Sequence, residues 1–353
     1  MLKPIPIIFD GNLFLNSISS AILGNLDDKD VIFQSKNTDP MKRGRGMLIK
    51  TFIQTYFSTI EAVRKKGYSI THSAIVWDRK LEGKYYKTSI LDKLNDGSTY
   101  KSDRKFVSED DLDDESLTDD ERKVIEASLC RSTEFLKARR FLQDNLPTYG
   151  IPNVSLPGWE ADDLDYVWGL ETNKREGLHI HCSGDSDWQF HLTNNDVHYQ
   201  PGRGGKVYVK TESTVREKFN ILDEYGLMEW ASIEFSALGS HNNLLRTIDP
   251  SIKRFTKKYR KKMYEDKDFS MIGDLSRFNA QKQVFDILSF PGLDTVKALY
   301  EEVLKVTPSS DESKFSNFLL KVGINSKDKA ILRNKYSSYK SAILNSKLNQ
   351  LDI

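Results

Sequence analysis

The chain contains 353 residues, and its 52 lysines and arginines nearly balance its 51 aspartates and glutamates, giving a formal net charge of +1. This length suits one large domain or two smaller ones, and the balanced charge excludes overall basicity as an argument for nucleic-acid binding. Cys130 and Cys182 lie outside any ligand pattern, so we expect no zinc site and no disulfides. The N-terminus lacks a basic region followed by a long apolar run, and no apolar run has membrane-spanning length, so we expect a soluble cytoplasmic protein without membrane contact. We also expect a monomer.

The first part of the chain alternates predicted strands and helices. Two short apolar runs predict buried strands, Ile5 to Phe9 and Ser73 to Trp77, and each is followed directly by an aspartate. Apolar residues at helical spacing predict two helices between these strands, and a polar stretch predicts a loop between the helices. The helices are expected at Leu13 to Leu23 and Met47 to Lys66, and the loop at Asp27 to Pro40.

A basic, tyrosine-rich segment from Lys80 to Lys105 follows, and then a dense acidic run from Phe106 to Arg122. Basic residues interleaved with aromatic ones suit a surface that tracks a nucleic-acid backbone, although a solvated helical face with half-packed tyrosines gives the same pattern. Acidic runs are commonly disordered or solvated, so the two segments together predict an arch at about residues 80–122, before a helix from Ile125 to Leu146. The candidate nucleic-acid contacts in the arch are Lys84, Tyr85, Tyr86, Lys87, Tyr100, Lys101 and Arg104.

The segment from Val154 to Leu192 contains two acidic clusters with the same layout. Each has an extended apolar run, a turn, a group of acids and a helical pattern. The acids suit helix N-termini, where Asp and Glu act as caps, but that explanation does not account for the repetition of the pattern in both halves. Open α/β sheets bind ligands at the carboxyl ends of their strands, where these acids are expected to lie.

The last part of the chain is predicted to be mainly helical. Two short strands are expected at Asp196 to Pro201 and Lys206 to Val209, and a helix at Met228 to Leu238; helical patterns then continue from Leu275 onward. The tract from Lys253 to Lys262 is strongly basic and either binds polyphosphate or increases solubility. Its candidate contacts with nucleic acid are Lys253, Arg254, Lys257, Lys258 and Arg260.

Acids at strand ends and helix starts are the main chemical signal in the sequence. Carboxylates that converge repel one another unless cations neutralise them, and hard oxygen ligands suit Mg²⁺ or Mn²⁺. Two such ions can activate a water and stabilise the leaving oxygen of a phosphodiester. The candidate metal ligands are Asp10, Asp78, Glu160, Asp162, Asp163, Asp185 and Asp187. His179, His181 and His191 flank the second cluster and are expected to pack or support rather than to bind metal.

Several motifs resemble the 5′-nuclease (flap endonuclease) superfamily, and most of all its phage branch, which includes the T-even phage ribonuclease H. They are FDGN at the first strand, VWD at the second, YKSDRK in the arch, GWEADD ending at Asp163, and CSGDSDWQFHL starting at Cys182. The pairing of GWEADD with SGDSD is the most specific of these, and the motifs span about Ile5 to Val209. In the C-terminal part, only KFSNFLLKVGI is suggestive.

The resemblance implies an α/β fold: a PIN-like three-layer domain with a central, mostly parallel sheet, a helical arch and a C-terminal helical region. We expect a catalytic domain at residues 1–212 and a helical DNA-binding region at 213–353, packed on the α/β body. The implied activity is Mg²⁺-dependent (or Mn²⁺-dependent) 5′→3′ removal of RNA primers, flaps or nicked-strand ends. Asp10, Asp78, Glu160 and Asp162 are expected to hold the first metal, Asp185 and Asp187 the second, and Lys101 and Arg104 to contact the scissile phosphate.

One stretch departs from the family pattern. Where the family usually has Gly-Asp-x-x-Asp-Asn, this chain has Gly239 to Leu244, in which Ser240 and Asn243 replace both aspartates. Neutral oxygens bind Mg²⁺ less well than carboxylates, so the second metal site is expected to be weakened, and the basic tract is a candidate for the duplex contact.

Three functions remain open from the sequence. The first is an active nuclease acting on DNA or RNA–DNA hybrids with free 5′ ends; the second is a non-catalytic relative that binds branched DNA as a replication accessory. The third, a PIN-type ribonuclease on single-stranded RNA, is disfavoured by the length of the arch and the helical tail. A single-stranded-DNA-binding protein or a sliding clamp is a candidate partner. RNA primer, flap and nick are all candidate substrates, and both exonucleolytic and endonucleolytic cutting are candidate modes.

Overall fold

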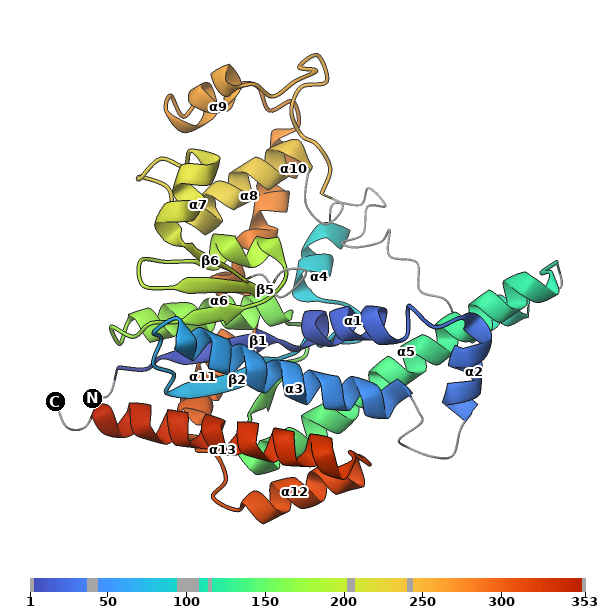
Figure 1. Cartoon of the computed structure of the whole chain (residues 1–353). Coiled ribbons are helices and arrows are strands. Elements are labelled where there is room, and N and C mark those ends of the chain that lie inside the picture. The colour runs from blue at the N-terminus through green and yellow to red at the C-terminus, as the bar shows by residue number, and fades with distance from the viewer. Residues whose placement is uncertain are drawn as a thin grey trace.

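The structure, a computed structural model, describes residues 3–36, 44–93, 108–113, 116–201, 207–239 and 244–350. Its centre is a six-stranded sheet in the order β3-β2-β1-β4-β5-β6 (Figure 1). The strands are β1 (Pro6–Asp10), β2 (His72–Val76), β3 (Asn153–Val154), β4 (Ile180–Cys182), β5 (Val197–Pro201) and β6 (Val207–Thr211). All neighbouring pairs are parallel except β5 and β6, which form an antiparallel edge. The predicted α/β architecture with a mostly parallel sheet is therefore confirmed.

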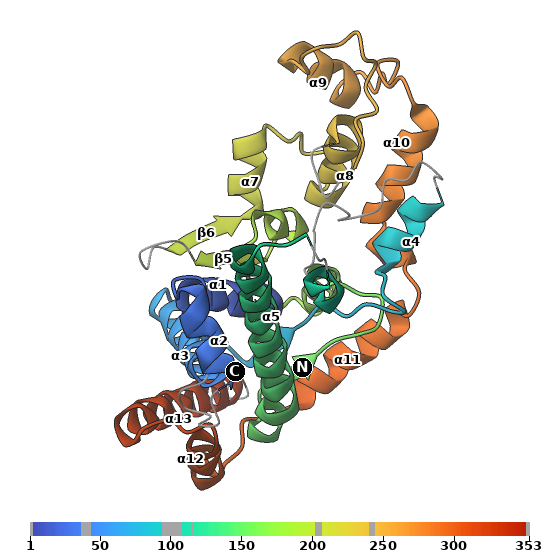
Figure 2. The same cartoon turned by 90° about the vertical axis from the view of Figure 1, so that its right-hand side faces the viewer.

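Helices cover both faces of this sheet and produce three layers (Figure 2). Side chains alternate along β1: Ile7 and Phe9 enter one core with α1 (Gly11–Ile22), α3 (Gly44–Lys65) and α5 (Asp119–Asn145), and Ile8 enters the other. That other core contains α6 (Ala161–Asn173) and α11 (Leu293–Lys305), which contributes Val296 and Tyr300. Both β1 and β2 are buried along their whole length, because helices cover the parallel sheet on both faces.

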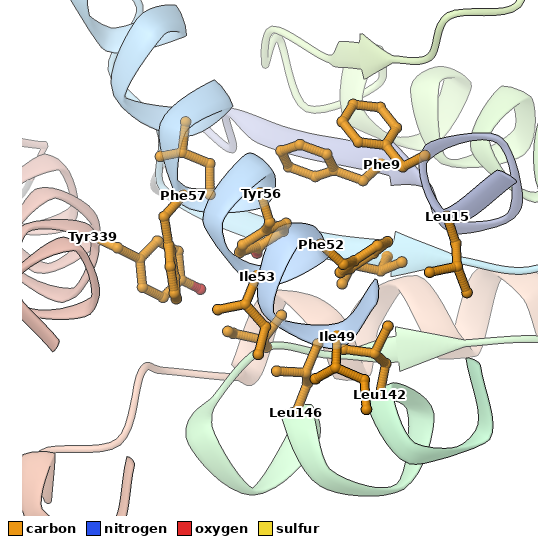
Figure 3. Close-up of a cluster of buried hydrophobic side chains, with 14 of the residues drawn as sticks. Phe9, Leu15, Ile49, Phe52, Ile53, Tyr56, Phe57, Leu142, Leu146 and Tyr339 are labelled. Carbon is orange, nitrogen blue, oxygen red and sulfur yellow. The ribbon is translucent and has the colours of Figure 1, made fainter. Parts of the chain in front are cut away.

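The two last helices, α12 (Glu312–Lys321) and α13 (Ser326–Asn349), pack against α3 on the α/β body. Phe57 of α3 contacts both helices, with its ring centroid 5.4 Å from that of Tyr339 and 6.0 Å from that of Phe315. Figure 3 shows Phe57 beside Tyr339. The Tyr339 hydroxyl is 2.7 Å from Ser73 Oγ at the sheet. These contacts bury aromatic side chains of α3, α12 and α13 together, so the helical C-terminus forms part of the main core.

A second core lies beyond the β6 edge of the sheet. It contains α7 (Glu212–Phe219), α8 (Leu227–Leu238), α9 (Lys257–Tyr264) and α10 (Leu275–Lys282), packed around Trp230. Phe190, which follows β4, stacks on Trp230 with ring centroids 5.7 Å apart and so joins this core to the α/β body. The predicted division of the chain near residue 212 stays a prediction. The helices α11 to α13 follow the second core in the chain but pack on the α/β body again.

Two sequence-based expectations about local structure are wrong. The predicted loop from Asp27 contains the helix α2 (Asp28–Lys36), which is fixed because Arg131 of α5 donates to Leu26 O at 3.2 Å and to Asp28 Oδ1 at 2.8 Å. The helix expected from Ile125 begins six residues earlier, at Asp119, where Thr118 and Glu121 form a capping box. Acids in a first helical turn interact favourably with the helix dipole, so part of the acidic run is ordered as a helix start.

Both cysteines are free, Cys182 being buried and Cys130 half-buried. Among the described helices, none has the length and apolarity needed to cross a membrane.

Candidate metal centre

The sheet topology brings the predicted acids toward the carboxyl-terminal end of the parallel strands. Because β1, β2 and β4 are parallel neighbours, their carboxyl ends point the same way: Asp10 pairs in register with Val76, and Phe9 with Cys182. Asp78 leaves β2 two residues after Val76, and its Oδ1 accepts a hydrogen bond of 2.8 Å from the Ala161 amide. That bond ties the first turn of α6, which carries the GWEADD acids, to the end of β2.

Asp10, at the end of β1, is a strongly perturbed acid of this group. It caps α1 by accepting from the Leu13 amide at 2.9 Å, and its Oδ2 accepts from Ser183 Oγ at 3.0 Å. Burial, with a smaller contribution from the negative charge of Asp78, raises the pKa of Asp10 to about 8. Two hydrogen bonds to its oxygens do not offset that cost, so the carboxylate form of Asp10 requires a nearby positive charge near neutral pH.

Glu160, Asp162 and Asp163 form the densest part of the centre. One carboxylate oxygen from each lies within 4.8 Å of the others, and Glu160 and Asp163 are almost fully buried. Burial also raises the pKa of Asp163 well above its usual range. Lys87 of α4 (Tyr86–Asp92) enters this cluster, with its Nζ 2.7 Å from Asp163, 3.1 Å from Glu160 and 3.4 Å from Asp162. Among the described residues, Lys87 thus places a positive charge inside the cluster, on a side chain that is only 5% exposed.

The acids after β4 are held differently. Ser183 Oγ, which donates to Asp10, also accepts from the Asp185 amide at 3.0 Å, so a single hydroxyl links the first strand to this loop. Asp185 then accepts from the Asp187 amide at 3.0 Å and caps the short 3₁₀ helix Ser186–His191. Asp185 is exposed and Asp187 half-buried. Burial and the charge of Lys218 lower the pKa of Lys210, and the negative charges of Asp185 and Asp187 partly offset this effect.

The donor set fits a divalent cation. All the groups are carboxylates, several are buried where an isolated negative charge is costly, and the Glu160–Asp162–Asp163 oxygens are close enough to share one ion. The cluster also exceeds what Lys87 alone can neutralise, since it presents three acids to one ammonium. Their roles as metal ligands and catalytic groups stay predictions.

No protein-family model matches this chain, and no curated protein matches it either. Solved structures with a similar arrangement include T5 5′-exonuclease with zinc ions bound, at 13% identity and a TM-score of 0.47, covering 95% of this chain and 99% of that one. The bacteriophage T5 flap endonuclease, in a complex with DNA and metal ions, is 15% identical with a TM-score of 0.49, covering 86% and 100%. Flap endonuclease-1 from Methanococcus jannaschii is 13% identical with a TM-score of 0.41, covering 97% and 94%.

By their names these proteins are 5′-nucleases, from the superfamily that the motifs in this sequence resemble. At such low identity, what this chain does has to be inferred from its own side chains.

The predicted nucleic-acid contacts in the arch have mixed surroundings. Lys84 is exposed and pairs with Asp92, and Tyr85 is half-buried with Lys80 Nζ 5.8 Å from its ring centroid. Tyr86 instead packs in the core against Trp159 and Phe290, with ring centroids 6.3 and 6.1 Å away. Tyr100, Lys101 and Arg104 lie outside the described residues, as do Ser240 and Asn243.

Sequence reasoning missed a basic cavity of about 650 Å³ between α5 and the β3 loop. Its lining includes four cationic side chains, from Arg79, Lys137, Arg139 and Arg140. Arg139 donates to the backbone carbonyl of Asp78, and its guanidinium carbon lies 5.4 Å from the Trp77 ring centroid. The cavity therefore adjoins the end of β2, close to Asp78. The cations that line it are separated in the sequence from this acid, and only the tertiary structure brings them together.

Sequence reasoning also missed Asp165, which joins two buried histidines, His179 and His181. Asp165 Oδ1 is 2.8 Å from His179 Nε2, its Oδ2 bonds His181 Nδ1, and all three side chains are fully buried. Burial alone would lower the pKa of His181, but Asp165 and Asp196 raise it to about 10. The pattern of a helix acid facing alternate histidines of one strand was a detectable signal. The network ties α6 to β4, the two elements that carry the acidic clusters.

We expect the free energy of unfolding to fall as the pH rises from about 6.5 toward 10. Folded His181 keeps its proton to about pH 10, whereas an unfolded histidine releases it near pH 6.5, so between these values the unfolded state binds fewer protons. Urea unfolding across this range measures the slope. Asp165→Asn should flatten it and cost about 3 kcal/mol near pH 6, because a buried imidazolium loses its partner. An unchanged slope in the variant would contradict this assignment.

Proposed function

We propose that this protein is a divalent-metal-dependent 5′→3′ nuclease that hydrolyses phosphodiester bonds of RNA primers, 5′ flaps or nicked strands. The observation that carries the proposal is the convergence of carboxylates from the ends of β1 and β2 and the start of α6, with Asp10 shifted to a pKa of about 8. Burying such a set costs stability unless it holds cations, and this cost favours a functional site over a structural one.

Each residue has a distinct task in this proposal. Mg²⁺ or Mn²⁺ held by the cluster would supply Lewis-acid charge to a phosphodiester and lower the pKa of a water. Ser183 orients Asp10, and the Ala161 amide orients Asp78, so both carboxylates are fixed before substrate arrives. The cations around the Arg139 cavity and the predicted arch residues Lys101 and Arg104 would offset the charge of the strand.

A second candidate function is a weakly catalytic relative that binds branched DNA as a replication accessory. Lys87 favours it, because its ammonium already neutralises part of the cluster that an ion would occupy. The neutral residues Ser240 and Asn243, in place of the two usual aspartates, point the same way.

A cleavage assay separates the two functions. The protein is incubated with a 5′-labelled flap, a nicked duplex and an RNA–DNA hybrid, with Mg²⁺ and with Mn²⁺, beside Asp185→Asn and the matched control Asp294→Asn, an exposed acid of α11. Metal-dependent cleavage that Asp185→Asn loses and Asp294→Asn keeps supports the nuclease. Binding without cleavage by the wild-type protein, with either ion, supports the accessory function instead.

The basic tract at α9 is proposed as a duplex contact. Lys253, Arg254 and Lys258 are exposed, whereas Arg260 is held by Glu234 at 2.9 Å. Replacing these three exposed residues with Gln should weaken duplex binding about tenfold or more and reduce the magnitude of the slope of log K against log salt by about 3, since each phosphate contact contributes roughly 0.9. Fluorescence anisotropy across a salt series measures both. Unchanged affinity and slope would exclude the tract from the interface.

A further inference from the structure

The second core opens into a cavity that the proposed reaction does not use. It has a volume of about 560 Å³ and lies between α7, α8 and α9, at the end of the molecule seen at the top of Figure 1. The apolar part of its wall is formed by Phe219, Leu222, Trp230, Phe235, Leu238 and Tyr264. A recess of this size and character is in the range that holds one or two large side chains of a ligand.

The polar groups at the cavity wall already satisfy one another. Glu234 is only 4% exposed; it accepts from Arg260 Nε at 2.9 Å and from the Tyr264 hydroxyl at 2.9 Å. The acid in the recess is therefore neutralised, and Arg260 is committed to it. A ligand would meet an apolar surface rather than a charged pocket floor.

Lysines surround the mouth. Lys218 of α7 and Lys257 and Lys261 of α9 line the cavity and are exposed, with Lys218 Nζ 4.6 Å from the Phe219 ring centroid. The other lining acid, Glu265, lies 3.7 Å from Lys261 and is partly offset by it. An apolar recess with a positive rim complements a ligand that is apolar at its tip and negative on its flanks.

Nucleic acid fits this recess poorly. Unpaired bases bind by stacking on open aromatic faces, but Trp230 and Tyr264 are each 5% exposed and stack on one another, with ring centroids 6.2 Å apart. Duplex phosphates are contacted by cations on open surfaces and gain nothing from an apolar cavity. The exposed residues Lys253, Arg254 and Lys258 of the same basic tract are outside the cavity lining and suit that task better.

We propose that this cavity is a docking site for an acidic peptide segment of a partner protein. One large apolar side chain of the segment enters the recess against the half-buried side chains of Leu222 and Leu238, and flanking carboxylates pair with Lys218, Lys257 and Lys261. The site shares no residue with the metal centre, so the proposal holds whether or not the protein cleaves nucleic acid. It identifies a surface through which the chain is recruited to another protein.

Fluorescence polarisation tests this with a panel of fluorescein-labelled octapeptides, each with acidic residues around a single central Trp, Phe, Leu or Ala. We expect saturable binding of at least one large-anchor peptide at micromolar concentration, about tenfold or more tighter than the Ala peptide. Leu238→Trp, which fills the recess, and the triple variant Lys218→Glu/Lys257→Glu/Lys261→Glu should each weaken binding about tenfold or more. The matched triple variant Lys253→Glu/Arg254→Glu/Lys258→Glu, outside the cavity, should change it less than about threefold.

Equal affinity for all four peptides, or equal losses in the two triple variants, would overturn the proposal. A labelled single-stranded oligonucleotide forms a separate arm: if it binds and Leu238→Trp abolishes that binding, the cavity takes nucleotides and the peptide assignment is wrong. Thermal unfolding of each variant checks the fold. Should Leu238→Trp fail to fold, the comparison of anchors and of the exposed lysine variants still decides.

Discussion

Asp10→Asn is expected to reduce metal-dependent cleavage by about a thousandfold, or about 4 kcal/mol of activation free energy, while leaving the fold intact. The neutral amide keeps the size of the side chain but removes the charge that a divalent ion requires. The same change should preserve or raise the melting temperature when no divalent ion is added, because burial makes ionisation of Asp10 costly, as its pKa of about 8 indicates.

Two measurements check this together: single-turnover cleavage of the best substrate and thermal unfolding in EDTA. A catalytic acid and a structural acid give opposite results here. If Asp10→Asn lowers the melting temperature strongly and cleavage falls only in proportion to unfolded protein, then Asp10 stabilises α1 as a cap and the metal assignment fails. Asp294→Asn serves again as the control, since its side chain is fully exposed.

Lys87→Met is expected to have the second large effect, by raising the affinity of the centre for Mg²⁺ and Mn²⁺ about tenfold or more. The lysine ammonium and a divalent ion compete for the same carboxylates, because Nζ lies 2.7 Å from Asp163 and 3.1 Å from Glu160. In EDTA the variant should lose about 3 kcal/mol of stability, since the buried carboxylates of Glu160 and Asp163 lose the ammonium that contacts them. Added Mn²⁺ should restore most of that loss.

Isothermal titration calorimetry and melting curves with and without Mn²⁺ measure the two effects. Lys84→Met is the matched control, because Lys84 precedes the same helix but is exposed and pairs with Asp92. An unchanged or weaker ion affinity in Lys87→Met would show that the lysine does not compete with the ion. In that case the role of Lys87 would be structural, and its ion pair with Asp163 would hold α4 in position.

Local patterns were sufficient where the physical cause is local. Apolar runs predicted β1 and β2, and helical spacing predicted α3 and α8 to within a few residues. The helix α2 was missed because its sequence is polar, and the Arg131 contacts that fix it come from a helix about one hundred residues away. The start of α5 was missed because an acidic run reads as solvated unless its capping box is recognised.

The same distinction between local and long-range causes applies to the candidate metal centre. The acids were identifiable because strand-end aspartates and the GWEADD and SGDSD motifs are visible in the sequence. Lys87 was read as a contact for nucleic acid, whereas the structure buries it among three carboxylates. A lysine in a basic, tyrosine-rich segment gives no local sign of which way it points.

By itself, the sequence determined the α/β class, the strand-end acids and the basic character of α9, because alternation, spacing and charge are properties of neighbouring residues. Only the tertiary structure decided that Ser183 links Asp10 to the Asp185 loop, that Lys87 contacts the α6 acids, and that α7, α8 and α9 enclose an apolar recess. These features join residues that are distant in the chain. Their geometry follows from how the helices pack on the sheet, which no single stretch of sequence specifies.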